Sequence, residues 1–253
     1  MLARAIRNVR DGIVASVYPE QCRLCGQMIE SYDDGVACLD CWKDSAITRL
    51  IADPACVKCA APLHTTTPYA TPLHVAHCGS CNGFAFSAAR ACGIYSGAIE
   101  ASILFLKSHP HICRRLRAII TETYSKHSLI LANDIIVPVP LHRSREMERG
   151  FNQARVLAKI ICSDFQLNMD DRLLVRVKRT ERHRAGLDLK DRARSVERAF
   201  EVTSPEALQG ARVLLVDDLF TTGSTIAAAT KALLEDGAAR VNVFTIARVA
   251  EKA

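Results

Sequence analysis

The sequence predicts an α/β protein in which a parallel-sheet domain follows a small metal-binding module. Eight cysteines fall in Cys-x-x-Cys pairs within the first 84 residues. Apolar runs of strand length then alternate with segments of helical periodicity. Near the C-terminus, one such run leads through a turn rich in hydroxyl groups into a helix. We therefore expect the module to cover residues 1–84 and the α/β domain residues 85–253.

The composition of the 253-residue chain is that of a folded globular protein. With 49% hydrophobic and 24% charged residues, the chain is too apolar to be disordered. Its 12 glycines and 9 prolines exclude a collagen-like repeat. The best apolar run, residues 101–106, is far too short to cross a membrane.

Apolar residues near the N-terminus have helical spacing but are interrupted by Arg4, Arg7 and Arg10. The segment therefore lacks the continuous apolar core of a secretory signal. It is either a helix packed on the next module or an amphipathic helix at a membrane surface. We favour the first interpretation, and expect a cytoplasmic protein without stable membrane insertion.

Four Cys-x-x-Cys turns are the first strong signal. Each turn aims two thiolates at one point, and two turns complete a tetrahedral site that usually holds Zn²⁺. Twelve residues separate the second cysteine from the third and eighteen separate the sixth from the seventh, close to ribbon spacing. Disulfides are not expected, because the sequence shows no export signal. The predicted metal ligands are Cys22, Cys25, Cys38, Cys41, Cys56, Cys59, Cys78 and Cys81.

The simplest pairing of the turns gives two consecutive zinc ribbons. A cross-brace that joins the first turn to the third, and thiol redox chemistry, are the alternatives. His64, His74 and His77 lie between the third and fourth turns and could replace a cysteine, but we interpret them as solvated. Four cysteines leave no open coordination position, so we expect two structural zinc ions that supply folding energy.

The α/β domain contains three apolar runs that fit buried parallel strands. Pro138 and Pro140 stop the first of these strands. The last two strands flank a helix that ends at Gly237, which predicts a βαβ unit. We expect strands at 134–140, 213–216 and 241–246 and helices at 99–107, 112–124, 151–165 and 223–234.

The sharpest motif is VLLVDDLFTTGST, residues 213–225. A helix N-terminus has free N–H groups and a positive dipole end, which attract a phosphate. Gly223 allows close backbone approach, the hydroxyls donate hydrogen bonds, and the two acids can accept them from a sugar diol. A helix cap by Thr222 or Ser224 explains only one hydroxyl. The predicted site is Asp217, Asp218, Thr221, Thr222, Gly223, Ser224 and Thr225.

Two common nucleotide motifs are missing from the sequence. It has no Gly-Lys-Ser/Thr loop of the Walker type. It has no Gly-x-Gly-x-x-Gly after a strand either, which argues against a dinucleotide site.

Residues 213–225 resemble the phosphoribosyl-pyrophosphate signature of type I phosphoribosyltransferases. With the four cysteine turns, VPVP at 137–140, RGFNQA at 149–154 and IAR at 246–248, the sequence resembles the ComF family of competence proteins. The resemblance runs from about residue 19 to residue 248. It implies a double zinc ribbon followed by a type I phosphoribosyltransferase fold, and a role in DNA uptake for natural transformation.

The resemblance also implies roles for individual residues. The two acids would contact the ribose hydroxyls of phosphoribosyl pyrophosphate, and the loop 221–225 would hold its 5-phosphate. Mg²⁺ would bridge the pyrophosphate, which leaves the anomeric carbon. The implied pyrophosphate site consists of Pro140, Leu141, His142 and Arg143, together with Lys107 at the end of a helix.

Two departures from this resemblance lie before the signature. Similar sequences carry Gln and Asn where this chain has His183 and Ser195, so the roles of those amides are in doubt. The sequence shows no clear general base. His142 and His183 are candidates only because of the pH range in which histidine titrates.

Residues 172–198 carry a net charge of +6, equal to that of the whole chain. They suggest a mobile arm over a polyanionic ligand, either phosphoribosyl pyrophosphate or a nucleic-acid backbone; the alternative is a solvated helix. Candidate nucleic-acid contacts are Arg182, Arg184 and Arg192. Stacking platforms are scarce, with Trp42 and Tyr69 the only candidates we identify, so single-strand binding should depend on phosphates and on salt.

Two functions fit these observations. The first is a ComF-like protein that binds phosphoribosyl pyrophosphate with Mg²⁺ and handles single-stranded DNA with other DNA-uptake proteins. The second is an active phosphoribosyltransferase of nucleotide or nucleoside metabolism with an unidentified nucleophile. We favour a working phosphoribosyltransferase over a binding module that has kept the pocket without the chemistry.

Overall fold

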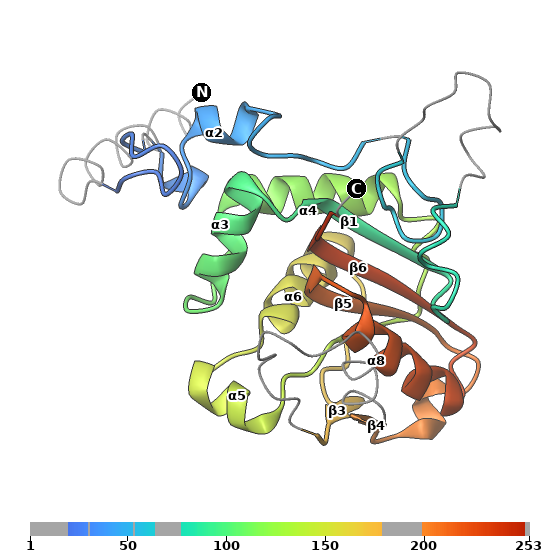
Figure 1. Cartoon of the computed structure of the whole chain (residues 1–253). Coiled ribbons are helices and arrows are strands. Elements are labelled where there is room, and N and C mark those ends of the chain that lie inside the picture. Colours follow the sequence, from blue (N-terminus) through green and yellow to red (C-terminus); the bar gives the residue numbers. More distant parts are fainter. Residues whose placement is uncertain (1–19, 30, 53, 64–76, 179–198, 251–253) are drawn as a thin grey trace, which may run out of the picture.

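The computed structural model describes residues 20–29, 31–52, 54–63, 77–178 and 199–250 (Figure 1). Within them, no helix is both long and apolar enough to cross a membrane. The elements in chain order are η1 (Tyr32–Asp34), α2 (Leu39–Lys43), β1 (Ala88–Ile94), α3 (Gly97–Leu106), α4 (Arg114–Lys126), β2 (Ile135–Pro138), α5 (Arg143–Arg149), α6 (Gln153–Phe165), β3 (Leu174–Arg176), β4 (Phe200–Val202), η3 (Pro205–Leu208), β5 (Arg212–Phe220), α8 (Ser224–Glu235) and β6 (Arg240–Arg248).

A four-stranded parallel sheet in the order β1-β6-β5-β2 forms the centre of the fold. The unit β5–α8–β6 is the predicted βαβ unit. Strands β5 and β6 are each nine residues long, several residues longer than the apolar runs alone indicate. The extra residues of β5 include Asp217, which pairs with Thr245 of β6 although it is polar, and Asp218, which follows it within the strand. The acids are therefore fixed by the sheet and do not belong to a free loop.

Strand β1 was not predicted from the sequence. Five of its seven residues, AARACGI, are small, the others being Arg90 and Ile94, and all seven are buried. The chain before β1 passes close to it: a Cβ on Gly93 would lie 2.7 Å from the carbonyl oxygen of Arg49. Close approach of another backbone therefore explains the glycine at position 93, and Ile94 is the one β-branched residue of the kind by which strands are usually recognised.

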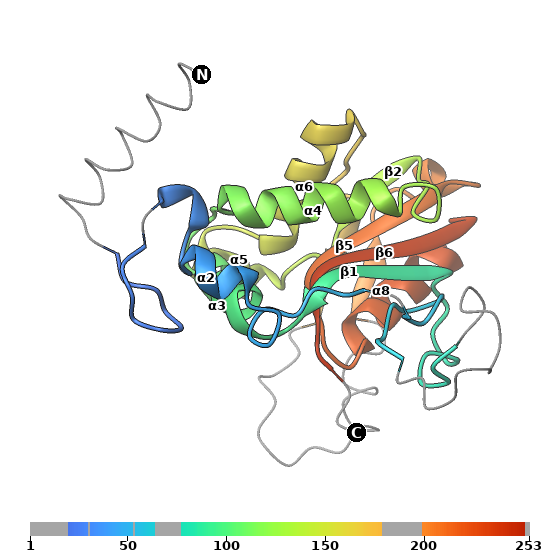
Figure 2. The same ribbon diagram turned by 90° about the horizontal axis from the view of Figure 1, so that it is seen from above.

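Both faces of the sheet are buried, as expected for parallel strands. Figure 2 shows α4 and α6 on one face and α8 on the other. Alternate residues of β5 separate accordingly: Leu214 and Val216 pack with α3, α4 and α6, whereas Val213 and Leu215 pack with α8. The continuous apolar runs in the sequence result from this two-sided burial.

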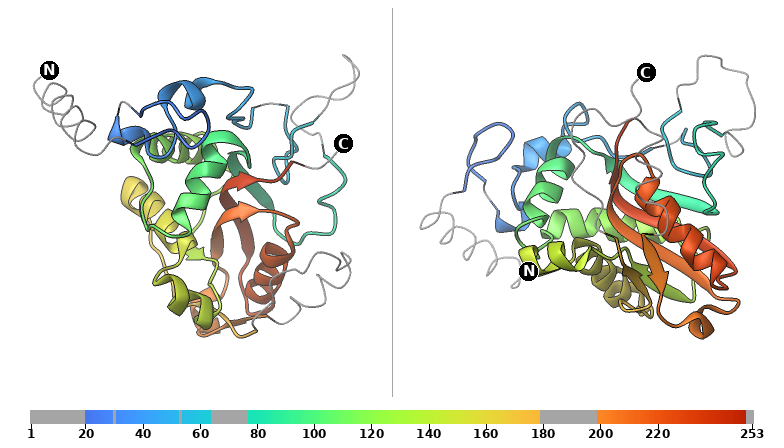
Figure 3. Two further views of the ribbon diagram at one scale, coloured as in Figure 1. Left: turned by 60° about the vertical axis from the view of Figure 1, so that its left-hand side comes forward. Right: turned by 60° about the horizontal axis from the view of Figure 1, so that its bottom comes forward.

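The first four cysteines belong to a ribbon that packs over α3 and α4 (Figure 3). The Trp42 indole nitrogen donates a hydrogen bond to the Asp34 carbonyl oxygen over 2.9 Å. The Asp34 carboxylate in turn accepts a hydrogen bond from Arg115 of α4 over 2.6 Å. The second ribbon packs elsewhere: Cys56, Cys59 and Cys81 join the core on the α8 face.

The short strands β3 and β4 form an antiparallel pair that the sequence analysis did not identify. They flank residues 179–198, which lie outside the described residues. Arg172 and Arg176, which we assigned to the basic arm, therefore lie in or beside a regular strand. Helix α5 was also missed, because its sequence RSREMER buries no side chain and has no apolar stripe.

Candidate functional site

The acids, the hydroxyl-rich turn and the segment after β2 lie at the carboxyl ends of neighbouring parallel strands. Asp217 and Asp218 are in the second half of β5, and the turn 221–223 joins β5 to α8. Residues 140–143 follow β2, which pairs with β5. Ligands of open α/β sheets bind at such carboxyl ends, so the topology brings the separate sequence motifs to one edge.

Gly223 is the residue that allows the turn. It caps the N-terminus of α8 with a left-handed backbone conformation, φ 78°. The Thr222 hydroxyl lies 2.9 Å from the Ser224 hydroxyl and accepts a weak hydrogen bond from the Ser224 N–H over 3.4 Å. In the described residues, the hydroxyls of Thr221 and Thr225 have no side-chain partner. The α8 N-terminus therefore presents several donors to a bound anion.

Three phenylalanines form a wall beside this turn. The ring centroids of Phe84 and Phe220 lie 5.8 Å apart, and those of Phe84 and Phe86 lie 5.2 Å apart. A Cβ on Gly223 would lie 2.5 Å from Phe84 Cζ and 2.9 Å from Phe220 Cζ. Glycine is therefore required here both for its backbone conformation and for space.

The two acids on β5 differ in their surroundings. Burial, and then the neighbouring charge of Asp218, raise the pKa of Asp217 well above its usual range. The charge of Arg176 on β3 opposes this shift. The Asp218 N–H donates a hydrogen bond to the Asp217 carboxylate over 2.9 Å. Two carboxylates in this position carry excess negative charge, which a cation or the hydroxyls of a bound ligand would stabilise.

Further charged and polar groups face these acids. Burial, followed by the charges of Glu100 and Asp218, raises the pKa of Tyr95, which follows β1. Burial, and then the charge of Arg145 on α5, lower the pKa of Arg176, whereas the charge of Asp217 raises it, so Arg176 lies within electrostatic range of both groups. Tyr95, Arg145 and Arg176 were not predicted as site residues from the sequence. No motif marks them, because β1 and α5 were not recognised and the β3–β4 hairpin depends on long-range pairing.

The implied pyrophosphate segment leads into α5. The His142 ring Nδ1 accepts a hydrogen bond from the Ser144 N–H over 3.2 Å, so His142 caps this helix. Pro140, Leu141 and His142 are half-buried and Arg143 is exposed. Lys107 is the half-buried residue that ends α3. His142 thus has a structural role whether or not it also contacts a ligand.

The eight paired cysteines form two separate clusters of four: Cys22, Cys25, Cys38 and Cys41, and Cys56, Cys59, Cys78 and Cys81. In each cluster the four sulfur atoms lie within 4.8 Å of one another. This grouping is that of consecutive ribbons and excludes the cross-brace. Among the histidines considered as substitutes, His77 is exposed, whereas His64 and His74 lie outside the described residues.

The geometry of both clusters fits zinc. Neighbouring sulfur atoms lie 3.5–3.7 Å apart. A tetrahedral ion with Zn–S bonds of about 2.3 Å needs a separation of roughly 3.8 Å. Burial opposes ionisation of Cys22 and Cys56, but backbone N–H groups outweigh it and lower the pKa of each to about 6. Burial is the largest cause that raises the pKa of Cys41, Cys59 and Cys81, so a bound cation would be needed to hold these members as thiolates. None of the eight is in a disulfide.

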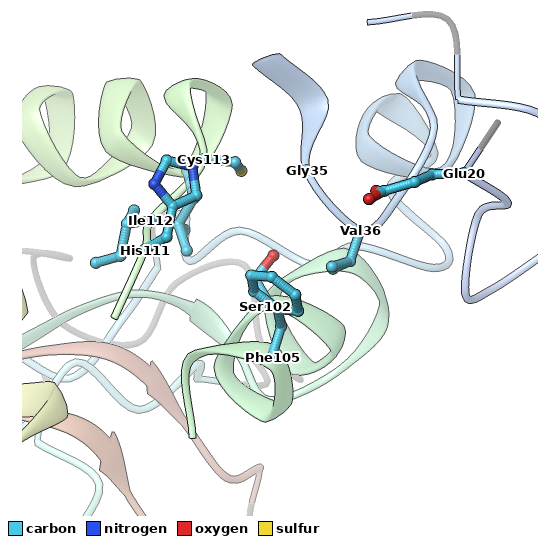
Figure 4. A pocket seen from close by; sticks show the side chains of 9 residues that line it. Glu20, Gly35, Val36, Ser102, Phe105, His111, Ile112 and Cys113 are labelled. Carbon is cyan, nitrogen blue, oxygen red and sulfur yellow. The ribbon is translucent and has the colours of Figure 1, made fainter. Parts of the chain in front are cut away.

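A small cavity lies apart from this sheet edge, between the first ribbon, α3 and α4 (Figure 4). Its volume is about 60 Å³, and Glu20, Ser102 and Cys113 are among its lining residues. The buried Ser102 hydroxyl has no hydrogen-bond partner among the described residues. The cavity has room for water but is much smaller than the roughly 300 Å³ typical of ligand pockets. It is therefore not a second sugar-phosphate site.

Several predicted residues cannot be placed. Arg182, Arg184, Arg192, His183, Ser195 and Tyr69 lie outside the described residues. Trp42 is described and is buried beside the first cysteine cluster, with its ring nitrogen bonded as stated above. Trp42 is therefore a packing residue and not an exposed stacking platform.

Comparison with known families agrees with this geometry. The model of the phosphoribosyl transferase domain matches residues 106–253, more than half of the chain. The chain belongs to the phosphoribosyl transferase domain family. The model of the double zinc ribbon domain matches residues 13–82, ahead of the phosphoribosyl transferase domain. The predicted fold class and the two-ribbon module are thereby confirmed.

Relatives with curated names match about half of this chain. Competence protein F of Haemophilus influenzae is 34% identical over 138 residues, which cover 54% of this chain and 59% of the relative. Competence protein ComFC of Bacillus subtilis is 36% identical over 45% of this chain and 44% of the relative. DNA utilization protein YhgH of Escherichia coli K12 is 36% identical over 46% of this chain and 49% of the relative. These matches confirm the resemblance to the ComF family, and each spans only about half of the relative.

Proposed function

We propose that the chain binds phosphoribosyl pyrophosphate with Mg²⁺ at the carboxyl edge of its sheet and acts in DNA uptake. The observation that carries the proposal is the junction of β5 and α8. Two carboxylates in the sheet lead directly to a left-handed glycine at a helix N-terminus. A ribose 5-phosphate fits this arrangement, because its hydroxyls can donate hydrogen bonds to the carboxylates and its phosphate can accept them at the helix N-terminus.

The phosphate half of the site consists of the turn and the first turn of α8. The 5-phosphate would accept hydrogen bonds from the backbone N–H groups after Gly223 and from the hydroxyls of Thr221, Thr222, Ser224 and Thr225. The phenylalanine wall behind Gly223 restricts where that phosphate can lie. The expected contribution is mainly electrostatic, because the dipole of α8 points at the anion.

The ribose and pyrophosphate half consists of Asp217, Asp218 and the segment 140–143. Asp217 already resists ionisation, because burial and then the charge of Asp218 raise its pKa. A site with this excess of negative charge fits a ligand that arrives with a cation. Mg²⁺ bound to the pyrophosphate would neutralise the leaving group and orient it. Arg176, which interacts electrostatically with Asp217, has the charge that suits the same pyrophosphate, and Arg145 adds positive charge beside Arg176.

The role in DNA uptake is inferred from relatives. Two of them are named competence proteins and a third a DNA utilization protein. We propose that the chain handles single-stranded DNA in that process, with the basic residues Arg182, Arg184 and Arg192 as phosphate contacts. Binding that depends on phosphates falls steeply as salt rises.

A titration of the zinc-loaded protein with phosphoribosyl pyrophosphate and Mg²⁺, followed by calorimetry, tests the pocket. We expect saturable binding that the double variant Asp217→Asn, Asp218→Asn loses. Asp134→Asn is the matched control, because Asp134 precedes β2 and pairs with Arg212 at the opposite end of the sheet. Binding that persists in the double variant would show that the site is wrong.

The same preparation separates a binding protein from an enzyme. An active phosphoribosyltransferase of nucleotide or nucleoside metabolism would release pyrophosphate when offered nucleobases, and the double variant would not. Salt-dependent affinity for an oligonucleotide, reduced by neutralising the three arginines, supports DNA handling. Unchanged affinity would exclude those arginines as the contacts.

A further inference from the structure

Arg248, at the end of β6, is a buried cation that the proposed ligand site does not use. Only 4% of the surface of Arg248 is exposed to solvent. One guanidinium nitrogen donates to the Cys59 carbonyl oxygen over 2.6 Å and lies 3.3 Å from the Cys59 sulfur. The guanidinium carbon lies 5.4 Å from the centroid of the Phe220 ring. Arg248 thus contacts a zinc ligand and a residue of the phenylalanine wall at the same time.

No carboxylate balances this charge within the described part of the chain. The ion pairs found there do not include Arg248, and its Nε atom has no hydrogen-bond partner. A buried cation without a counter-charge is strongly destabilising. Four thiolates around one Zn²⁺ carry a net charge of −2, and Cys59 is the member of that set closest to Arg248. The loaded second cluster is therefore the natural counter-charge.

The other side of Arg248 leads to the phosphate-binding turn. Phe220, under the guanidinium, packs edge-on against Phe84. Phe84 in turn occupies the space that a side chain at position 223 would need. Lys58, next to Cys59, donates a hydrogen bond to the Phe84 carbonyl oxygen over 2.7 Å, which is a second connection between the ribbon and the turn. Two short paths of direct contacts thus join the second metal cluster to Gly223.

The first cluster has no such connection. Among the described residues, the hydrogen bonds to its sulfur atoms come from Leu24 and from the cysteines themselves, and none comes from an arginine or lysine side chain. The first cluster packs in the core on the α4 face, whereas the turn belongs to the α8 side. The two clusters are therefore expected to affect the turn differently.

We propose that Arg248 is a positioning residue that couples metal loading of the second cluster to the geometry of the phosphate-binding turn. With metal bound, the thiolate set holds Arg248, and Arg248 holds Phe220 and Phe84 against Gly223. Without metal, the buried guanidinium loses its counter-charge and the wall behind Gly223 loosens. The proposal depends on the proposed function only for the identity of the ligand at the turn.

Zinc release tests the metal half of the proposal. The reduced protein should carry two zinc equivalents, and a chromophoric chelator reports how fast each leaves. Pulsed alkylation with mass spectrometry shows which cysteines become reactive. Loss of an outer partner of a metal ligand typically lowers metal affinity about 10-fold to 100-fold. Arg248→Met should therefore weaken zinc binding at Cys56, Cys59, Cys78 and Cys81 by that factor and leave the first cluster unaffected.

Two further variants keep the result interpretable. Arg248→Lys retains the charge but not the planar fork, so its effect should be smaller. Arg115→Met is the matched control: it removes an arginine that pairs with Asp34 beside the first ribbon and touches no thiolate of the second cluster. If zinc left the second cluster equally fast in wild type and in Arg248→Met, this would overturn the proposed link between Arg248 and that cluster. Equal acceleration in Arg115→Met would do so too, because the effect would then be general loosening.

Hydrogen exchange tests the coupling without requiring any ligand. Peptides covering residues 219–227 should exchange faster in Arg248→Met than in wild type or Arg115→Met. Removing zinc from the wild type should produce the same increase, and should add little in Arg248→Met. Unchanged exchange in this turn when the second zinc is lost would refute the coupling. This result is independent of whether phosphoribosyl pyrophosphate binds, so failure of the proposed function is recognised separately.

Discussion

Phe84, which follows the second ribbon, lies directly against Gly223 at the N-terminus of α8. A Cβ added to Gly223 would meet Phe84 Cζ at 2.5 Å, well inside the distance of ordinary contact. A residue just outside the cysteine cluster thereby shapes the turn that we propose binds phosphate. The ribbon and the sheet edge are parts of one packed structure, and the following predictions depend on that packing.

Gly223→Ala should destabilise the protein and abolish binding at the turn. Alanine at φ 78° costs about 1–2 kcal/mol in backbone strain, and displacing Phe84 adds roughly 1–3 kcal/mol. Gly210→Ala is the matched control, because Gly210 has φ 72° with nothing within 4 Å of the added Cβ. Thermal denaturation should show a larger loss for Gly223→Ala than for Gly210→Ala. Equal losses would mean that the contact with Phe84 contributes nothing.

Most of the sheet could be predicted because the sequences of its strands show local apolar patterns. In β5 and β6 both faces are buried, so the sequence shows an unbroken apolar run at 213–216 that two acids follow, and a mostly apolar run at 241–246 that only Asn242 and Thr245 interrupt. The turn that we propose binds phosphate could be predicted as a candidate for a related reason: its motif is local, and all its residues lie within nine positions of one another. The two metal clusters are local in the same way, since each is made of two short turns.

What the sequence did not reveal depends on contacts between distant segments. Strand β1 has a glycine at position 93 where the chain near Arg49 runs alongside it, and no local pattern records that neighbour. Arg176 reaches the acids only through the β3–β4 pairing. Arg248 was noticed as part of IAR at 246–248, but its contact with Cys59 spans 189 positions. The composition of a segment cannot indicate a partner so far away.

Asp217→Asn should raise the thermal stability of the ligand-free protein at neutral pH. Burial and the charge of Asp218 raise the pKa of Asp217, so the folded state binds its proton at a higher pH than the unfolded chain does. Stability is therefore lost as pH rises from about 4, the value for an unfolded aspartate, through the raised pKa. Asparagine cannot ionise, so the variant does not lose stability in this pH range. Melting temperatures compared across that range should converge at the acidic end.

Asp134→Asn provides a control of opposite sign. The exposed Asp134 pairs with Arg212, which lowers the pKa of Asp134 to about 2. The stability that this ion pair contributes is present above about pH 4 and is lost as pH falls toward the lowered pKa of Asp134. The asparagine variant should therefore melt slightly earlier than wild type at neutral pH. Identical pH profiles for the two variants would contradict the electrostatic account of Asp217.

Thr48→Val should separate the first ribbon from α3. The buried Thr48 hydroxyl donates to the Cys41 carbonyl oxygen over 2.7 Å and accepts from the Ala98 N–H over 3.0 Å. Valine has nearly the same shape but leaves both backbone groups buried without a partner. Each such group costs about 1–3 kcal/mol, so we expect a total loss of at least about 2 kcal/mol. In a protein of this size that lowers the melting temperature by several degrees.

The location of the damage distinguishes this effect from a general loss of stability. Cys41 is a ligand of the first cluster, so a chelator should remove the first zinc from Thr48→Val faster than from wild type, and the second at the wild-type rate. Thr48→Ser keeps the hydroxyl and should stay close to wild type in both measurements. If Thr48→Val had the same melting temperature as the wild type, the two hydrogen bonds would not be what attaches the first ribbon to α3. The packing of Trp42 and the Arg115–Asp34 pair would then have to hold it alone.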